Sequence, residues 1–419
     1  MNDSTPTSRR VADLLTVLEV SRELAATADL VPLLRKIEQA ALQVLRCERA
    51  TVFLFDPVAG ELFSRFATGV DEIRFPADQG IAGEVVRTGA VIEVPVAYAD
   101  PRFNREIDRR TGFRTRNMIA LPLIGFDGAT VGVLQVLNKV DDGFDAWDRQ
   151  LAETLGGQVG VVLQRQLLLE QYAEKQRLQA DLNIARDIQR NLLPERPPEV
   201  PGFDLAGFNQ PADETGGDCY DFIPLEDGCV GITIADATGH GIGPALVIAE
   251  CRALFRATIG LSRDLAANVC RINDLLCEDL PSDRFVTAFF GLLNPADGSL
   301  VHHSAGHGPL IHYRRAEDRF HELKPSGIPL GIMRGARFDA PQRLVLSPGD
   351  LMVLVTDGFL EWARADGEQF GAARLEQTVR RHRDETSAAI IAAIHEAVVS
   401  FAAGKPQADD LTAVVIRRT

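Results

Sequence analysis

Apolar residues recur at helical spacing near the start of the chain. One set from Leu14 to Leu18 predicts a first helix, and a second set from Leu33 to Leu45 predicts another. A helical segment at 147–169 closes this part of the chain. Strands with helices at both ends indicate an α+β domain, a sheet with helices packed on it. The strands are short alternating segments separated by glycines, and they are predicted at 51–55, 62–66, 91–94, 119–124 and 130–137.

The next segment, 163–193, contains neither glycine nor proline and is rich in Leu, Ala, Gln, Glu and Arg, so it is predicted to be one helix. Its apolar residues fit a rough a/d seam with one polar interruption at Gln189, and such heptads favour pairing with a second copy of the helix. A monomeric amphipathic helix lying on its own domains is the alternative. Prolines from Pro194 onward end the helix and mark a domain boundary. The seam residues are Leu168, Leu178, Leu182, Ala185 and Leu192.

In the C-terminal half, acidic residues fall at the ends of predicted strands. The alternating segment 229–234 predicts a buried strand that leads into Asp236 and then into the turn Gly239-His240-Gly241. Each acidic cluster alone is typical of a turn. If the clusters converge, their like charges require cations, and oxygen ligands without Cys or His partners indicate Mg²⁺ or Mn²⁺ rather than zinc. The other clusters are Asp218 and Asp221 after two glycines, Asp357 after the strand 351–355, and Asp409-Asp410 before the strand 411–416.

Composition narrows the function classes. The chain has 44 Lys and Arg against 59 Asp and Glu, a formal charge of −15, which disfavours nucleic acid or an anionic membrane as the main partner. The six cysteines form no CxxC pair and are expected to be reduced thiols. The polar residues 1–10 are expected to be a disordered tail. Without a signal peptide or an apolar run long enough to span a bilayer, the sequence predicts a cytoplasmic protein.

Residues 80–123, beginning GIAGEVVRTG and ending RNMIALPL, resemble GAF domains, particularly those of cyclic-nucleotide phosphodiesterases and cyanobacterial adenylyl cyclases. The resemblance continues through Asn138, Lys139, Phe144 and Asp148, and it implies that these four residues mark a site for a cyclic nucleotide or another small ligand. Arg149 departs from the Glu of that motif. A sensory or dimerising domain in which the motif is structural is the alternative.

From about residue 181 onward, an ordered set of motifs resembles the metal-dependent protein phosphatases (PPM, protein phosphatase type 2C-like), in the bacterial branch typified by SpoIIE and RsbU. The resemblance implies two stacked antiparallel sheets with helices outside, and metal ions at one edge between the sheets. The motifs are IARDIQRNLLP, GGDCYDF, ADATGHG, FVTAFFGLL, SAGHGPL, GIPLGI, TDGFLEW and ADDLTAVVI.

The same resemblance implies roles for individual residues. Asp236 would bridge two Mn²⁺ or Mg²⁺ ions, with the carbonyl of Ala237 as a further ligand. Asp357 and Asp409 would hold one ion, with Asp410 as the alternative to Asp409, and Asp218 would face the other ion through water. Two such ions lower the pKa of a bridging water, so that hydroxide attacks the phosphorus of phosphoserine or phosphothreonine. His240 is either a general acid or a structural, hydrogen-bonding histidine.

The sequence therefore predicts a tail and helix start at 1–24, a GAF sensory domain at 25–165, a signalling helix at 166–195 and a phosphatase domain at 196–419. The predicted function is that of a homodimeric protein phosphatase controlled by its GAF domain. Relatives imply that its substrate is a phosphorylated STAS-domain anti-anti-sigma factor in a partner-switching pathway. A catalytically silent signalling module that senses a small ligand and binds partners is the alternative.

Overall fold

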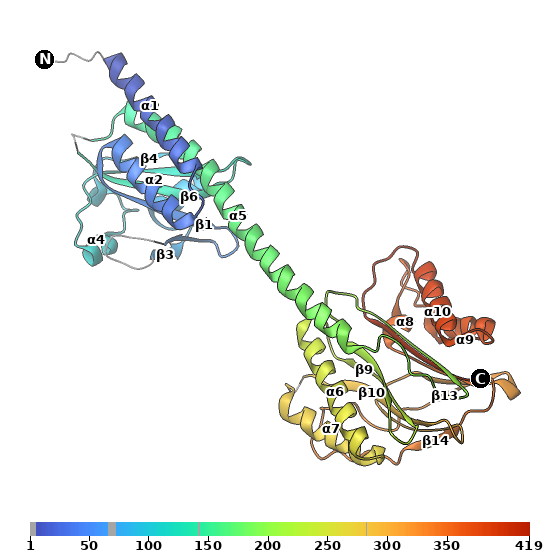
Figure 1. Ribbon diagram of the computed structural model, residues 1–419. Helices are drawn as coiled ribbons and strands as arrows, with labels where there is room; N and C mark the ends of the chain where they lie inside the picture. The colour runs from blue at the N-terminus through green and yellow to red at the C-terminus, as the bar shows by residue number, and fades with distance from the viewer. Residues whose placement is uncertain (1–5, 66–72, 141–142, 282) are drawn as a thin grey trace. The chain divides into compact units, whose positions relative to one another are not determined.

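The computed structural model describes residues 6–65, 73–140, 143–281 and 283–419. The chain forms two compact units, 1–177 and 178–419, and each is described by itself (Figure 1). Helix α5 (Ala146–Leu192) contributes its first part to the N-terminal unit and its last part to the C-terminal unit. Among the described residues, no helix is both long and apolar enough to cross a membrane.

The N-terminal unit is built on an antiparallel sheet with the strand order β3-β2-β1-β6-β5-β4. Helices α1, α2 and the first turns of α5 cover one face of the sheet, and α3 packs on the other. The strands are β1 (Cys47–Asp56), β2 (Glu61–Ser64), β3 (Ile73–Pro76), β4 (Ile92–Val94), β5 (Met118–Ile124) and β6 (Thr130–Lys139). The helices are α1 (Pro6–Ala25), α2 (Leu30–Leu45), α3 (Gly80–Thr88) and α4 (Arg105–Thr111), with a 3₁₀ turn at Ala97–Ala99.

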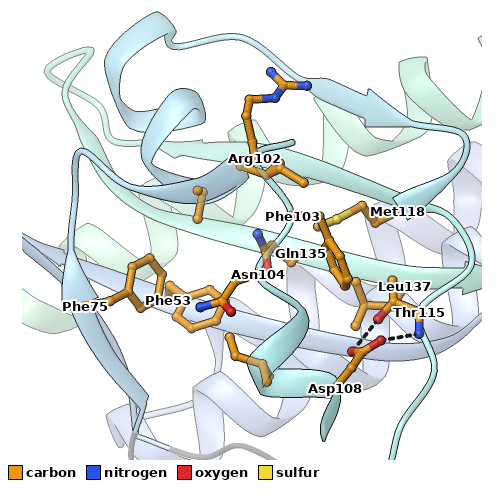
Figure 2. Close-up of a pocket in the computed structure, with 14 residues that line it drawn as sticks. Phe53, Phe75, Arg102, Phe103, Asn104, Asp108, Thr115, Met118, Gln135 and Leu137 are labelled. Carbon is orange, nitrogen blue, oxygen red and sulfur yellow. Dashed lines mark hydrogen bonds between the residues drawn. The ribbon is translucent and has the colours of Figure 1, made fainter. Parts of the chain in front are cut away.

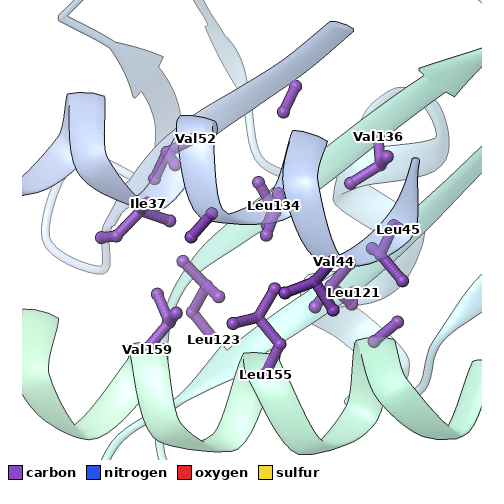
Figure 3. Close-up of a cluster of buried hydrophobic side chains, with 14 of the residues drawn as sticks. Ile37, Val44, Leu45, Val52, Leu121, Leu123, Leu134, Val136, Leu155 and Val159 are labelled. Atoms are coloured by element: carbon purple, nitrogen blue, oxygen red, sulfur yellow. The ribbon is translucent and has the colours of Figure 1, made fainter. Parts of the chain in front are cut away.

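The main core of this unit lies between the sheet and helices α2 and α5. Apolar residues recur every three or four positions in α2, so one face of the helix is buried along its length. Ile37 and Val44 of α2 meet Leu155 and Val159 of α5 above strand side chains such as Leu134 (Figure 3). Burial of each such side chain stabilises the fold by roughly 1.5–3 kcal/mol.

The C-terminal unit is a sandwich of two antiparallel sheets, each with five strands among the described residues. The strand orders are β14-β11-β10-β9-β8 and β13-β12-β15-β16-β7, and the inner faces of the two sheets share one apolar core. The strands are β7 (Phe203–Gln210), β8 (Asp218–Pro224), β9 (Val230–Ala237), β10 (Val286–Asn294), β11 (Ser299–Ala305), β12 (Leu310–Arg314), β13 (Arg319–Leu323), β14 (Gln342–Val345), β15 (Leu351–Val355) and β16 (Leu411–Arg418).

Helices cover the outer faces of this sandwich. The pair α6 and α7 packs on the first sheet, and α9 and α10 pack on the second, each over its own apolar cluster (Figure 1). The helices are α6 (Ile242–Leu261), α7 (Leu265–Asp279), α8 (Asp357–Glu361), α9 (Gly371–His382) and α10 (Ser387–Ala402), with a 3₁₀ turn at Arg315–Glu317.

The predicted fold class, an α+β domain followed by a β-sandwich flanked by helices, is confirmed. The predicted strands of the N-terminal unit correspond to β1, β2, β4, β5 and β6, whereas β3, α3 and α4 are additional elements that the sequence analysis did not predict. The prediction of a tail at 1–10 is wrong where the structure describes it, since α1 begins at Pro6; residues 1–5 lie outside the described residues. All six cysteines are free thiols.

The a/d seam of α5 is divided in the structure. Leu168 and Leu178 are exposed, whereas Leu182, Ala185 and Leu192 are half-buried. The polar residue that interrupts the seam, Gln189, is also half-buried. In its last turns, therefore, the seam side of the helix is partly covered within the C-terminal unit.

Candidate functional site

Strand alternation brings two of the predicted site residues to the inner edge of the sandwich. Along β9, Ile232 and Ile234 belong to the core between the sheets, so the period of two places Asp236 on the same inner face. Along β8, Phe222 belongs to that core, and the same period places Asp218 inward. Asp218 and Asp236 are direct cross-strand partners in the β8–β9 ladder.

The opposite sheet contributes to the same edge. Thr356 directly follows β15, and its hydroxyl donates a hydrogen bond to Oδ2 of Asp218 at 2.8 Å. The backbone N–H of Thr412 in β16 donates to the Thr356 hydroxyl at 3.0 Å. Residues from both sheets therefore meet at this end of the sandwich.

Like charges face each other here. Burial, followed by the charge of Asp236, raises the pKa of Asp218 well above its usual value. Burial, followed by the charges of Asp357 and Asp409, raises the pKa of Asp236 to about 7. Among the described residues, no Lys or Arg is a main influence on the pKa of either carboxyl. The cluster is thus an uncompensated concentration of negative charge.

Asp357 and Asp409 lie at the exposed rim of this cluster. Asp357 is the first residue of α8, and partial burial together with the charge of Asp409 raises its pKa. The side chain of Asp409 accepts a hydrogen bond from the backbone N–H of Asp410 at 2.8 Å. Unlike Asp218, both residues are therefore exposed to solvent.

Asp410 differs from its neighbour because it is buried and both of its carboxylate oxygens accept backbone hydrogen bonds. Oδ1 accepts from the N–H of Ala212 at 2.7 Å, and Oδ2 accepts from the N–H of Gly217 at 2.6 Å. A Cβ at Gly216 would lie 2.5 Å from Oδ2 of Asp410, and a Cβ at Gly358 would lie 2.0 Å from its carbonyl oxygen. Gly216 and Gly358 therefore lie so close to Asp410 that a larger side chain at either position would clash with it.

Ala237 and His240 follow Asp236 in different environments. Ala237 is buried, and its N–H donates to the carbonyl of Gly217 at 2.9 Å. A Cβ at Gly217 would lie 2.7 Å from the carbonyl oxygen of Ala237. The His240 side chain is 87% exposed, and its Nδ1 lies 3.0 Å from Oδ2 of Asp213. His240 is thus a surface residue beside the cluster.

The donor set fits a hard divalent cation. Its side chains offer only oxygen atoms, and their mutual repulsion is the condition that a bound cation relieves. In the part of the chain that the structure describes, however, no group of three or more His, Cys, Asp or Glu side chains is arranged so that it could hold a metal ion. Among the described residues, the ligand atoms that a metal site needs are therefore present, but they are not arranged around a single point.

The four residues predicted to mark a ligand site in the N-terminal unit lie in a different kind of environment. Lys139 donates to Asp148 at 2.6 Å and to the carbonyl of Leu45 at 2.8 Å, with both charged side chains buried. Asn138, at φ 57°, accepts from the N–H of Arg116 and donates to Glu48 and to the carbonyl of Arg114. Phe144 packs against the main core, and its ring centre lies 6.0 Å from Nζ of Lys139. These contacts connect the end of β6 to α2, to β1 and to the start of α5.

A separate cavity of about 80 Å³ lies on the other face of the sheet, and none of those four residues is among its described lining residues. Figure 2 shows Phe53, Phe75 and Phe103 around the amide side chains of Asn104 and Gln135. A further lining residue, Asp108, accepts from Tyr98 and twice from Thr115, so its carboxylate is fully engaged. The lining of the cavity is mostly apolar, with three phenylalanine rings, and the cavity is smaller than the roughly 300–1,000 Å³ typical of pockets for drug-sized ligands.

Comparisons with known proteins match a different family to each of the two units of the chain. Residues 226–419 match the family described as stage II sporulation protein E (SpoIIE), and residues 29–163 match the GAF domain family. The chain joins a GAF domain to a SpoIIE-type phosphatase domain. The GAF match coincides with the N-terminal unit, and the SpoIIE match covers the sandwich from the end of β8 onward.

Three relatives illustrate the similarity. The phosphoserine phosphatase RsbU of Bacillus subtilis is 24% identical over 247 residues, which are 58% of this chain and 72% of RsbU. The solved SiaA-PP2C domain of Pseudomonas aeruginosa is 25% identical with a TM-score of 0.52, covering 58% of this chain and 98% of that domain. The probable 3′,5′-cyclic phosphodiesterase pde-5 of Caenorhabditis elegans is 30% identical over 142 residues, 30% of this chain but only 19% of that protein.

Several residues of the phosphatase domain have roles that the motifs did not reveal. Gln189 lies in the motif IARDIQRNLLP and Thr356 in the motif TDGFLEW. Their hydrogen-bond partners, Gly216 and Asp218, are distant in sequence. Asp221, an acidic residue of the first cluster, is fully buried and paired with Arg252 and Arg256 of α6. It therefore anchors a helix to the sheet, and its local sequence could not distinguish it from Asp218.

Proposed function

We propose that this chain is a metal-dependent phosphoserine and phosphothreonine phosphatase. The observation that carries the proposal is the cluster of Asp218, Asp236, Asp357 and Asp409 at one edge of the sandwich, where burial and neighbouring carboxylates raise the pKa of Asp218, Asp236 and Asp357. The matched part of RsbU, a relative named as a phosphoserine phosphatase, supports the same activity.

In this proposal Asp236, Asp357, Asp409 and the carbonyl of Ala237 would hold Mn²⁺ or Mg²⁺, and Asp218 would lie beside the ions. Asp409 is preferred to Asp410 because both carboxylate oxygens of Asp410 already accept backbone hydrogen bonds. Asp410 then acts as a structural residue that holds the loop before β8.

When bound, the ions supply Lewis acidity that activates water and neutralises phosphoryl oxygens. The chain's own residues hold and orient the ligands. Thr356 donates to one oxygen of Asp218 and so fixes the orientation of that carboxyl. The exposure of His240 and its contact with Asp213 favour the hydrogen-bonding role over general acid catalysis.

The proposed substrate is a phosphorylated protein, and the family resemblance points to a STAS-domain anti-anti-sigma factor. The test is hydrolysis of a phosphoserine protein by the full chain with Mn²⁺, compared with Asp236→Ala. The proposal requires Mn²⁺-dependent release of phosphate by the wild type and its loss in the variant. No activity in either protein would support the catalytically silent signalling module instead, and equal activity in the two proteins would show that Asp236 is not a required metal ligand.

The GAF domain is proposed to be the sensor that controls the phosphatase, in a cytoplasmic homodimer. Because its cavity is small and mostly apolar, we expect a ligand smaller than a cyclic nucleotide. Thermal unfolding of the full chain with cyclic AMP or cyclic GMP should then show no stabilisation. Control by this domain also requires that deletion of residues 1–165 changes the phosphatase rate or its Mn²⁺ dependence; an unchanged rate and dependence would exclude it.

A further inference from the structure

Gln189, in the last turn of α5, holds a single glycine of the loop before β8. Its side-chain N–H donates to the carbonyl of Gly216 at 2.6 Å, and its side-chain oxygen accepts from the N–H of Gly216 at 3.0 Å. A carboxamide offers one donor and one acceptor side by side, so it can satisfy both backbone groups of one residue, as a neighbouring strand does. This pairing explains why a polar residue interrupts the apolar seam of the helix.

The other side of the same loop is held by Asp410. Its carboxylate accepts from the N–H groups of Gly217 and Ala212, and it approaches Gly216 so closely that no side chain fits there. The loop therefore lies between a helix side chain and a carboxylate that directly precedes β16.

The position of this loop determines where two proposed metal ligands lie. Gly217 directly precedes Asp218, and its carbonyl accepts from the N–H of Ala237, the residue after Asp236. A shift of Gly216 would therefore be transmitted to both carboxylates through the backbone within one or two residues.

Other contacts between the helix and the loop are few and polar. Gln179 donates to Glu214 at 3.0 Å, and the charge of Arg186 acts on the same carboxylate. Beside them lies a hollow of about 1,040 Å³, lined by Gln189, Arg190 and other residues of the helix end and of β7. Among the described contacts between this helix and this loop, Gln189 alone bonds to both backbone groups of one residue.

We infer that Gln189 is a positioning residue for the proposed metal centre, because it holds the loop that leads directly into Asp218 and that is bonded through Gly217 to Ala237, the residue after Asp236. The inference rests on the proposed metal-dependent phosphatase. It assigns to α5 a direct effect on metal affinity, transmitted through Gly216.

The test is calorimetric titration of the full chain with Mn²⁺, with the unfolding midpoint of each variant in EDTA as a second readout. Gln189→Leu, which keeps the size of the side chain, should weaken Mn²⁺ binding about 10- to 100-fold, the range seen when a residue supporting metal ligands is lost. Gln189→Glu keeps the acceptor and loses the donor, and its affinity should be intermediate. Gln179→Leu is the matched control, because it removes a contact between the same helix and loop without touching the backbone of Gly216.

Wild-type affinity in Gln189→Leu, or an equal loss in Gln179→Leu, would overturn the inference. If Gln189→Leu does not fold, Gln189→Asn replaces it, because its shorter side chain cannot reach both groups of Gly216. If the wild type binds Mn²⁺ but hydrolyses no phosphoprotein, the proposed function fails, and the affinities still decide the role of Gln189. A wild type that binds no Mn²⁺ would overturn both.

Discussion

In the GAF domain the buried Lys139 and Asp148 form an ion pair at 2.6 Å, whereas in the phosphatase domain the buried Asp218 and the half-buried Asp236 are neighbouring carboxyl groups, and burial raises the pKa of both. A paired buried charge is compensated within the fold, so its presence needs no ligand. An uncompensated cluster destabilises the fold and is retained where it binds something of opposite charge. This difference supports a structural role for the motif of the GAF domain, and it supports the metal site that we propose for the acidic cluster of the phosphatase domain.

The largest effect on stability is expected from breaking the GAF ion pair. Lys139→Met leaves Asp148 buried without its partner and should cost about 3–5 kcal/mol of GAF-domain stability. Trp147 reports on this domain, and Trp362→Phe leaves it as the single tryptophan, so denaturation followed by fluorescence measures the change.

The matched control replaces both partners of the pair. Lys139→Met with Asp148→Leu should recover much of the lost stability because no charge is then left buried. A single variant as stable as the wild type would show that the pair is not structural and would restore these residues as ligand candidates.

Removing a charge from the phosphatase cluster should have opposite effects on activity and stability. Asp236→Asn should lower the phosphatase rate about 10²–10³-fold. It should also raise the stability of the metal-free domain by about 1–2 kcal/mol above pH 7, because it removes a repelling charge. Phosphate release and denaturation in EDTA measure the two effects. Loss of stability in the variant would contradict the view that the cluster is uncompensated.

A smaller change in stability is expected from Glu38, a partly buried carboxyl group of the GAF domain. Burial raises the pKa of Glu38 from 4.5 to about 7. The folded state therefore binds a proton that the unfolded state has lost between these values, and stability falls as pH rises through this window. Glu38→Gln should be more stable than the wild type by about 1–2 kcal/mol at pH 8, a figure reduced for partial exposure, and should show no advantage at pH 4.5. A constant difference across this range would contradict the shift.

The smallest effect is expected at the exposed pair beside the cluster. His240→Gln should change stability by less than about 0.5 kcal/mol, because exposed ion pairs contribute little. Its phosphatase rate should stay within about threefold of the wild type. A fall of about 10²-fold or more, with the rate profile losing a basic limb, would instead identify His240 as the general acid.

Local sequence patterns predicted the parts of the fold that repeat regularly. The strand expected at 351–355 has the bounds of β15, and the alternation that ends in Asp236 is that of β9. Contacts between distant residues could not be predicted in this way. The hydrogen bond from Gly217 to Asp410 joins positions 193 residues apart, so only the family resemblance favoured Asp409 over Asp410 at the level of sequence. In the structure both carboxylate oxygens of Asp410 accept backbone hydrogen bonds, which supports the same preference.

Gln189 illustrates the same limit. Its sequence position shows only a polar break in an apolar seam, while its two bonds to Gly216 depend on how the helix end lies against the sandwich. Lys139 and Asp148 are the reverse case, since a motif associated with ligand binding in relatives forms a buried ion pair in this chain.

Mn²⁺ binding to the full-length wild type and to Asp236→Asn, measured by calorimetry at about pH 6.5 in buffers of different ionisation enthalpy, tests the central claim most directly. Because the pKa of Asp236 is raised to about 7, the wild type should bind Mn²⁺ and release protons as it does so. Asp236→Asn should show no such binding. Equal Mn²⁺ affinity in the two proteins, or binding without proton release, would contradict the assignment of this cluster as the metal centre of a phosphatase.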